Sequence, residues 1–252
     1  MLSINLSGHL AVVTGGTGQL GPVMVRTMAA CGAGVVIHYH QNVQMARQLL
    51  TEVRAAGLPG MIAQADVTLE QDVQRIKAEI NKTLGAPDII INNAVIQYAW
   101  ANVLEQPQAD YEGQFRSCVL HNVLMAQAFV PAMLAKNWGR VIAINTECAM
   151  QNFPKQSAYV AGKRGMDGVL RVLAREVGQH QVTVNQVAPG WMMSEAASSH
   201  GNDAAYIQQV PLKRRGTDQD VANLVAFLAS DLAGFISGQY ISVSGANVMP
   251  TI

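Results

Sequence analysis

Strand-like apolar runs alternate with helical patterns along the whole chain. The runs lie at 9–15, 34–40, 60–67, 87–94, 139–146, 182–190 and 238–246, and the segments with helical spacing lie at 23–32, 42–57, 69–85, 111–139, 157–178 and 217–230. The runs are continuously apolar, which is typical of strands buried on both faces of a parallel sheet. The sequence therefore predicts an α/β fold in which residues 1–252 form one doubly wound domain with helices on both faces of the sheet.

The composition excludes several classes of function. Half of the residues are hydrophobic, 13% are charged and the formal net charge is zero, which argues against the basic stripe of a nucleic-acid-binding protein. No apolar run has the length expected of a membrane span, and the N-terminus does not read as a signal peptide. Three cysteines without metal-ligand spacing indicate reduced thiols. We therefore expect a cytoplasmic protein with no metal site, no nucleic-acid or membrane partner, and apolar surface that packs against other subunits.

A glycine-rich turn follows the first predicted strand. Gly16, Gly18 and Gly21 form a G-x-G-x-x-G pattern within the stretch TGGTGQLG at 14–21, between a strand and a helix. Glycines allow a tight turn and a close approach of the backbone to a pyrophosphate, and the helix N-terminus supplies free N–H groups. This context favours a dinucleotide site, and the alternative is a glycine turn that only packs the helix on the sheet.

The end of the second predicted strand bears on the choice of dinucleotide. It carries Tyr39, His40, Gln41 and Asn42, and the next acidic residue after the glycine turn is Glu52, inside a helix. A carboxylate at the strand end would bind the ribose hydroxyls of NAD and repel a 2′-phosphate. Its absence favours NADP(H) over NAD(H), with His40 either beside the phosphate or simply in an exposed loop.

Tyr159 and Lys163 lie four residues apart in a predicted helix, so they share one helix face. A free tyrosine has a pKa near 10, and a neighbouring ammonium favours the phenolate and lowers that pKa. Thr146 ends the preceding strand, 13 residues before Tyr159, and its hydroxyl is placed to hold a substrate oxygen. The pattern predicts a proton-transfer centre, and the alternative is an ordinary pair on a helix surface.

Together these motifs resemble those of the single-domain short-chain dehydrogenases/reductases, over nearly the full length of the chain. The matching stretches are Thr14-Gly15, Gly21, Asp66-Val67, the NNA of 92–94, Tyr159, Lys163, NQVAPG at 185–190, PLKRRG at 211–216 and FLASDLAGFISGQYISV at 227–243. The resemblance implies a seven-stranded parallel sheet of the Rossmann type, a nicotinamide cofactor and a homotetramer.

The resemblance also implies roles for individual residues. Tyr159 would be the general acid/base, Lys163 would bind the nicotinamide ribose and lower the tyrosine pKa, and Thr146 stands where the family usually has serine. The cofactor would contact Gly15, Thr17, Gly18, Gln19, Leu20, Gly21, Tyr39, His40, Asp66, Val67, Asn93, Ala94, Val95, Tyr159, Lys163, Pro189, Gly190 and Ser194.

Other positions besides Thr146 also depart from the family pattern. Gln19 replaces the middle glycine of TGxxxGxG, although the stretch also fits the TGxxGxxG of the longer-chain branch. Val95 replaces the glycine of NNAG. Cys118 falls where a helix asparagine commonly completes a water relay, so we expect it in the catalytic set, with His121 or Asn122 as alternatives.

The substrate is expected to meet the loops after the fourth, fifth and sixth strands. We predict contacts from Gln97, Phe153, Trp191 and Met192, which form a mostly apolar set and favour an apolar ketone or secondary alcohol. The segment 191–215 is predicted to close over this end as a lid. Glu147, beside Thr146, either faces solvent or acts in the pocket.

The leading hypothesis is therefore an oxidoreductase that moves a hydride between a nicotinamide and an apolar ketone or secondary alcohol. An alternative within enzymes is a 3-oxoacyl thioester reductase. A second alternative is a non-catalytic dinucleotide-binding sensor or partner subunit, because the fold alone does not prove chemistry.

Overall fold

The chain folds around one seven-stranded parallel sheet. The computed structural model describes residues 3–193 and 203–250. The strands are β1 (Leu10–Val13), β2 (Gly34–Tyr39), β3 (Gly60–Gln64), β4 (Ile89–Asn92), β5 (Gly139–Ile144), β6 (Val182–Pro189) and β7 (Tyr240–Val243). Their order is β3-β2-β1-β4-β5-β6-β7 and every pairing is parallel. The predicted doubly wound sheet is confirmed.

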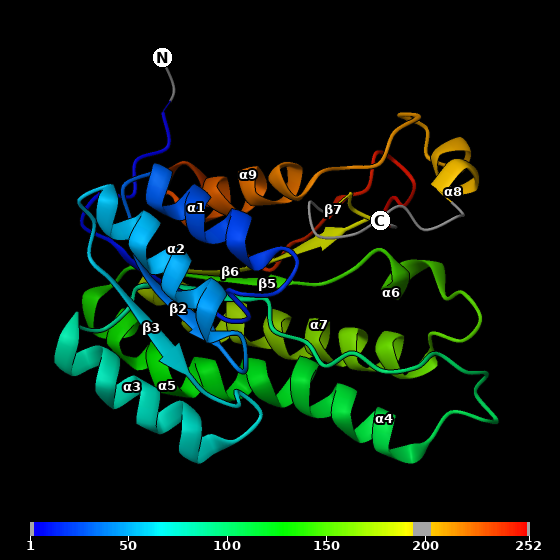
Figure 1. Ribbon diagram of the computed structural model, residues 1–252, viewed down its shortest axis with the longest axis horizontal. Coiled ribbons are helices and arrows are strands. Elements are labelled where there is room, and N and C mark those ends of the chain that lie inside the picture. The colour runs from blue at the N-terminus through cyan, green and yellow to red at the C-terminus, as the bar shows by residue number, and fades with distance from the viewer. Residues whose placement is uncertain (1–2, 194–202, 251–252) are drawn as a thin grey trace.

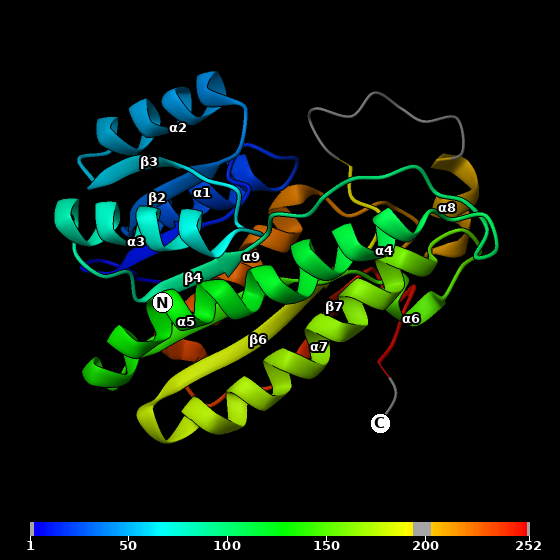
Figure 2. The ribbon, with the colours of Figure 1, turned by 90° about the horizontal axis from the view of Figure 1, so that it is seen from below.

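Helices cover both faces of the sheet, as Figures 1 and 2 show. One layer holds α1 (Gly21–Ala30), α2 (Val43–Ala55) and α9 (Asp218–Ala229), and the other holds α3 (Glu70–Thr83), α5 (His121–Lys136) and α7 (Ser157–Val177). Successive strand side chains enter opposite layers, so Val13 packs with the first set and Val12 with the second. Burial on both sides explains why the strands are continuously apolar.

The helix that ends at Lys136 is less regular than the sequence pattern predicts, and it begins and ends three residues earlier than the predicted segment 111–139. It begins as α4 (Gln108–Gln114), widens into the π-helical segment Phe115–Leu120, and continues as α5. Taken as one 29-residue helix, Gln108–Lys136 has the length and apolar character of a membrane span, contrary to the expectation that no run reaches that length. Its most apolar window is half buried within the protein, where it packs against α7 and the sheet.

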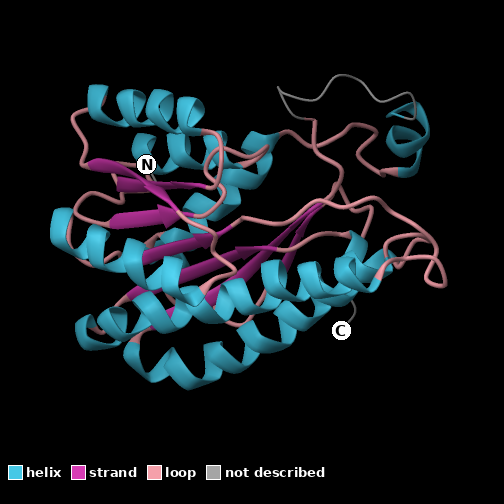
Figure 3. Cartoon of the chain, turned by 60° about the horizontal axis from the view of Figure 1, so that its bottom comes forward, coloured by secondary structure: helices cyan, strands magenta, loops and turns pink. Residues whose placement is uncertain are grey.

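Two short helices lie where the sequence pattern predicts only loops. They are α6 (Cys148–Gln151), after β5, and α8 (Asp203–Gln209), after β6. Helices of one or two turns show little apolar periodicity and are stable only when packed on other structure. Figure 3 shows both near the end of the sheet at which the strands finish. They therefore shape the region where an α/β protein binds its ligand.

Candidate active site

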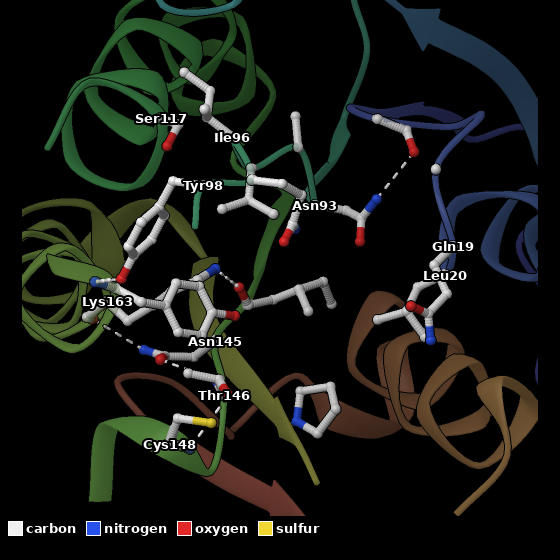
Figure 4. A pocket seen from close by; sticks show the side chains of 18 of the residues that line it. Gln19, Leu20, Asn93, Ile96, Tyr98, Ser117, Asn145, Thr146, Cys148 and Lys163 are labelled. Carbon is white, nitrogen blue, oxygen red and sulfur yellow. Dashed lines mark hydrogen bonds between the residues drawn. The ribbon is translucent and has the colours of Figure 1, made fainter. Parts of the chain in front are cut away.

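A cavity of about 1100 Å³ lies at the carboxyl ends of the strands. It runs from the glycine turn after β1, past the end of β4, to the loops after β5 and β6. The sheet order reverses between β1 and β4, and this switch point is where open α/β sheets bind ligands. In Figure 4, Gln19 and Leu20 lie across the pocket from Lys163, Thr146 and Cys148.

The glycine turn is held against the end of β4. The side-chain amide of Asn93 donates to the carbonyl oxygens of Thr14 and Gly15, at 3.1 and 3.0 Å. The Thr14 hydroxyl in turn accepts from the backbone N–H groups of Asn93 and Ala94. Gly15 has a φ of +60°, and a Cβ on Gly21 would lie 2.2 Å from the Gly15 carbonyl oxygen. The backbone geometry therefore requires glycine at positions 15 and 21, independently of any cofactor contact.

His38 supports the same turn from β2, and nothing in the sequence pattern marked it. Its Nδ1 accepts a hydrogen bond from the Gly15 N–H at 2.9 Å, and its Nε2 donates to the Ala65 carbonyl at 3.0 Å. The imidazole is 1% exposed, and burial lowers its pKa to about 4. His38 is therefore neutral at pH 7 and joins the glycine turn to the end of β3.

The expected adenosine end of the pocket is only partly as predicted. His40, Asp66 and Val67 line it, together with Gln41 and Asn42. Tyr39 does not line it: its side chain is 7% exposed and packs in the core beside α2, because neighbouring strand residues face opposite sides. Asn42 caps α2 by accepting from the Met45 N–H.

The remaining predicted cofactor residues divide into three groups. The cavity wall includes Gly15, Thr17, Gly18, Gln19, Leu20, Asn93, Ala94, Val95, Pro189 and Gly190. Gly21 is buried and is not part of the cavity wall. Ser194 is outside the described residues, as are residues 195–202 of the expected lid.

Thr146, Tyr159 and Lys163 meet where β5 ends. The Thr146 side chain acts on the Tyr159 phenol and opposes the rise of its pKa, and Tyr240 donates to the Thr146 carbonyl. Lys163 is 3% exposed, donates to the Ile144 carbonyl at 2.5 Å, and lies 5.8 Å from the centre of the Tyr159 ring. All three predicted residues therefore face one point of the cavity.

The expected effect of the lysine on the tyrosine is absent from this arrangement. Burial is the largest influence on Tyr159 and raises its pKa, while burial lowers the pKa of Lys163. The ammonium is directed to a backbone carbonyl, so the phenol gains little from its charge. Tyr159 is therefore protonated at neutral pH, as a proton donor requires.

Cys118 lies in the π-helical segment and is 1% exposed. Its thiol faces the Gln114 side-chain oxygen at 3.7 Å, and its backbone carbonyl accepts from the Asn122 amide at 2.7 Å. Among the described residues of this segment, the cavity is lined by Ser117, and Cys118 and Asn122 lie behind it. His121 is also buried, and burial lowers its pKa to about 3. The structure thus does not place the Cys118 side chain at the reacting centre.

The predicted substrate residues Gln97, Phe153, Trp191 and Met192 all line the cavity. Sequence reasoning did not single out three further wall residues as substrate contacts: Gln151, Gln156 and Tyr206. Gln156 lies three residues before Tyr159, and residues with this spacing share a helix face, so the sequence could have predicted that Gln156 lies near the cavity. Gln151 and Tyr206 lie in the two short helices, which no periodicity predicted.

Glu147 is 3% exposed, so it does not face solvent. Its Oε1 accepts from the Tyr206 hydroxyl at 2.8 Å, and its Oε2 accepts from the Asn247 amide at 3.1 Å. The Tyr206 hydroxyl also accepts from the Trp191 N–H at 2.8 Å. Burial raises the pKa of Glu147, and these hydrogen bonds oppose that rise. One carboxylate therefore ties α8 and the turn after β7 to the end of β5.

The loop after β6 has a second support. The Arg215 guanidinium lies 4.5 Å from the centre of the Trp191 ring and donates to the carbonyl oxygens of Trp191 and Met192.

Within the described residues, no group of three or more His, Cys, Asp or Glu side chains is arranged to hold a metal ion. Fold and site together define an α/β dinucleotide-binding protein with a tyrosine–lysine–threonine centre.

Comparison with known proteins agrees with this class of protein. The family model described as Enoyl-(Acyl carrier protein) reductase matches residues 18–245. The 3-oxoacyl-(acyl carrier protein) reductase FabG of Staphylococcus epidermidis is 32% identical over 95% of this chain and 98% of its own length. The protein of the same name from Escherichia coli is 32% identical over 98% of this chain and 100% of its own.

Solved structures show the same architecture. A putative gluconate dehydrogenase from Agrobacterium tumefaciens superposes with a TM-score of 0.92 at 24% identity, covering all of both chains. A 7α-hydroxysteroid dehydrogenase, complexed with NADH and 7-oxo glycochenodeoxycholic acid, superposes at 0.91 and 27% identity, over 98% of this chain and 97% of its own. The chain belongs to the short-chain dehydrogenase/reductase family and is an oxidoreductase of the nicotinamide-dependent kind.

Proposed function

We propose that this protein reduces an apolar ketone with NADPH, and catalyses the reverse oxidation of the secondary alcohol. The observation that carries the proposal is the meeting of Thr146, Tyr159 and Lys163 on the wall of a cavity that begins at the glycine turn. A bound reduced nicotinamide would supply a hydride to the carbonyl carbon. The chain must then hold the carbonyl oxygen and give it a proton.

Two hydroxyl groups divide that work. The Thr146 hydroxyl donates a hydrogen bond to the substrate oxygen and orients it, and the Tyr159 phenol donates the proton as negative charge develops there. The elevated pKa of Tyr159 keeps the phenol protonated until an alkoxide, which is a much stronger base, forms beside it. The Lys163 ammonium lies 5.8 Å from the centre of the Tyr159 ring and is held on the Ile144 carbonyl, so we assign it no direct part in the proton transfer.

The residues present fit a dinucleotide. Gly15 and Gly18 line the cavity beside the N-terminus of α1, where backbone N–H groups favour a phosphate. The strand end His40–Asn42 carries no carboxylate to repel a 2′-phosphate, which supports NADP(H) over NAD(H). We assign Lys163 to the nicotinamide ribose, and Asp66 and Val67 to the adenine.

The wall at the other end supports an apolar substrate. Phe153, Trp191 and Met192 expose ring and thioether surface to the cavity. The names of the curated relatives favour a 3-oxoacyl thioester as the specific alternative, since such a compound is also a ketone with an apolar chain. The two candidates share the same proton donor and differ in what surrounds the carbonyl.

We further propose a single-domain cytoplasmic enzyme that works as a homotetramer, with the described parts of 191–215 closing over the substrate. An apolar groove between α5 and α7, lined by Val123, Ala126, Val169, Val172 and Leu173, supports subunit packing. Trp191 and Tyr206, whose rings meet edge-to-face at 5.4 Å, support closure at the substrate end. Size-exclusion chromatography with light scattering tests the tetramer.

The function is tested by titrating the protein with NADPH and NADH and then following absorbance at 340 nm with a panel of ketones and a 3-oxoacyl thioester. We expect tighter binding of NADPH and its oxidation by apolar ketones. Preference for NADH would overturn the cofactor assignment. Tight cofactor binding with no turnover of any ketone or thioester would instead favour a non-catalytic dinucleotide-binding protein.

A further inference from the structure

Two amide groups of the cavity wall carry a buried atom that lacks a protein partner. Gln156 is 7% exposed, and its Oε1 is buried and accepts no hydrogen bond from the described residues. The Nε2 of Gln151 is buried and, among the same residues, donates none. Both side chains line the cavity. Leaving a buried polar atom without a hydrogen bond costs about 1–3 kcal/mol, and most buried polar atoms in proteins are therefore paired. We therefore expect a ligand to pair these two atoms.

The two amides lie beside the reacting centre. Gln156 is three residues before Tyr159 and seven before Lys163, on the same face of the helical path and about 4.5 Å from Tyr159 along the axis. Gln151 ends α6, the helix that Cys148 begins. The Cys148 N–H donates to the Thr146 hydroxyl at 3.2 Å, and Cys148 lies beside Thr146 in Figure 4.

The unpaired atom of Gln156 is its side-chain amide oxygen. An amide oxygen only accepts hydrogen bonds, so it is an acceptor that a ligand hydroxyl can use.

We infer that Gln156 Oε1 and Gln151 Nε2 form a subsite for a hydroxyl group that the substrate carries one or two carbons from the reacting carbonyl. A hydroxyl donates one hydrogen bond and accepts others, so it offers the kind of partner that each of the two atoms lacks. The substrate is thus a hydroxyketone, or a diol in the reverse direction, with an apolar remainder against Phe153 and Trp191. The inference rests on the proposed function and narrows its substrate class.

The surroundings disfavour a charged group at this subsite. Both amides are neutral, and the carboxylate side chain of Glu147 belongs to the same end of the cavity. A substrate carboxylate or phosphate would lose its hydration there and meet a like charge. A hydroxyl avoids both penalties.

The experiment compares three ketones of equal length that differ at one position: hydroxyl, methoxy and methyl. The quantity measured is kcat/KM for each, in the wild type, Gln156→Leu, Gln151→Leu and the exposed control Gln44→Leu. The wild type should prefer the hydroxyketone over the methyl ketone by about tenfold, the worth of one good hydrogen bond. Gln156→Leu should remove the preference for hydroxyl over methoxy, because only a hydroxyl donates to Oε1.

Gln151→Leu should lower kcat/KM for the hydroxy and methoxy ketones together and leave kcat/KM for the methyl ketone unchanged. Gln44→Leu should change none of the ratios of kcat/KM between the three ketones. Equal activity of the wild type toward all three ketones would overturn the inference while leaving the proposed function intact. Equal loss for all three ketones in Gln156→Leu would also overturn it, because Gln156 would then support the fold. Calorimetric binding of a diol and its matched mono-alcohol to the NADP⁺-loaded protein should show the same preference, and no preference there contradicts the subsite even if turnover fails.

Discussion

The Gly15 backbone N–H donates to Nδ1 of His38, so a buried imidazole on β2 holds the turn that is expected to bind the cofactor phosphates. Because Nε2 donates to Ala65, the bridge needs a neutral ring with the proton on Nε2. Protonation of Nδ1 would remove the acceptor and release Gly15. His121 and His40, together with Asp66 and Asp72, also influence the charge of this ring.

The His38 bridge predicts a loss of stability in acid. Its pKa is about 4 in the folded protein and near 6.5 in an unfolded chain. The unfolded state therefore binds the extra proton first, and the free energy of unfolding falls as the pH drops from about 6.5 to about 4, by about 3 kcal/mol in total. Urea denaturation at a series of pH values measures this fall, to which His121 also contributes.

Variants at position 38 separate the bridge from the titration. His38→Asn keeps one acceptor and one donor without a titrating ring, so it should bind NADPH with affinity near that of the wild type and lose part of the pH dependence. His38→Leu should weaken NADPH binding by about tenfold or more. His180→Asn, at a histidine remote from the cavity, is the matched control. Wild-type NADPH affinity in His38→Leu would contradict the assigned role.

Two glycines of the turn should respond differently to alanine. A Cβ on Gly21 would lie 2.2 Å from a backbone oxygen that cannot move aside, so Gly21→Ala should destabilise the protein by about 3 kcal/mol or more. A Cβ on Gly18 meets the Gly15 oxygen at 3.3 Å, so Gly18→Ala should fold. Its methyl group projects from the cavity wall and should weaken cofactor binding. Thermal unfolding and NADPH titration distinguish the two, and equal unfolding temperatures would contradict this account.

The Glu147–Tyr206 hydrogen bond should matter for substrate more than for cofactor. Glu147→Leu and Tyr206→Phe each break the bond that ties α8 to the end of β5, so each should raise the KM for a ketone by roughly 5- to 30-fold at unchanged NADPH affinity. The double variant should be little worse than either single one, because both remove the same interaction. Fully additive effects on KM would show that the two residues act independently.

The sequence predicts the strands and the long helices of this protein better than it predicts which side chains line the cavity. Continuous apolar runs identified the strands, and the four-residue spacing of Tyr159 and Lys163 placed both on one face at the cavity. The same reasoning assigned Tyr39 to the cofactor, because residue order alone does not say which of two neighbouring strand residues faces the core. His38 went unnoticed for the same reason.

The substrate end was harder to predict because its parts come from short elements. α6 and α8 span four and seven residues, too few for a periodic signal, and they carry Gln151 and Tyr206. Alignment with the family pattern put Cys118 in the catalytic set, yet the π-helical segment turns Ser117 toward the cavity and leaves Cys118 behind it. A change of helix type shifts the facing residue, and this is not visible in a count along the sequence.

The central claim is that the Tyr159 phenol protonates the substrate oxygen. Its direct test is a single-turnover measurement with Tyr159→Phe, in which the enzyme is first loaded with NADPH and its oxidation by a ketone is then followed at 340 nm. The substitution removes one oxygen from a half-buried ring at the cavity wall, so the fold and the NADPH affinity should persist. We expect NADPH oxidation to slow by about 100-fold or more, the usual contribution of a positioned general acid. Oxidation within a few fold of the wild-type rate would contradict the account.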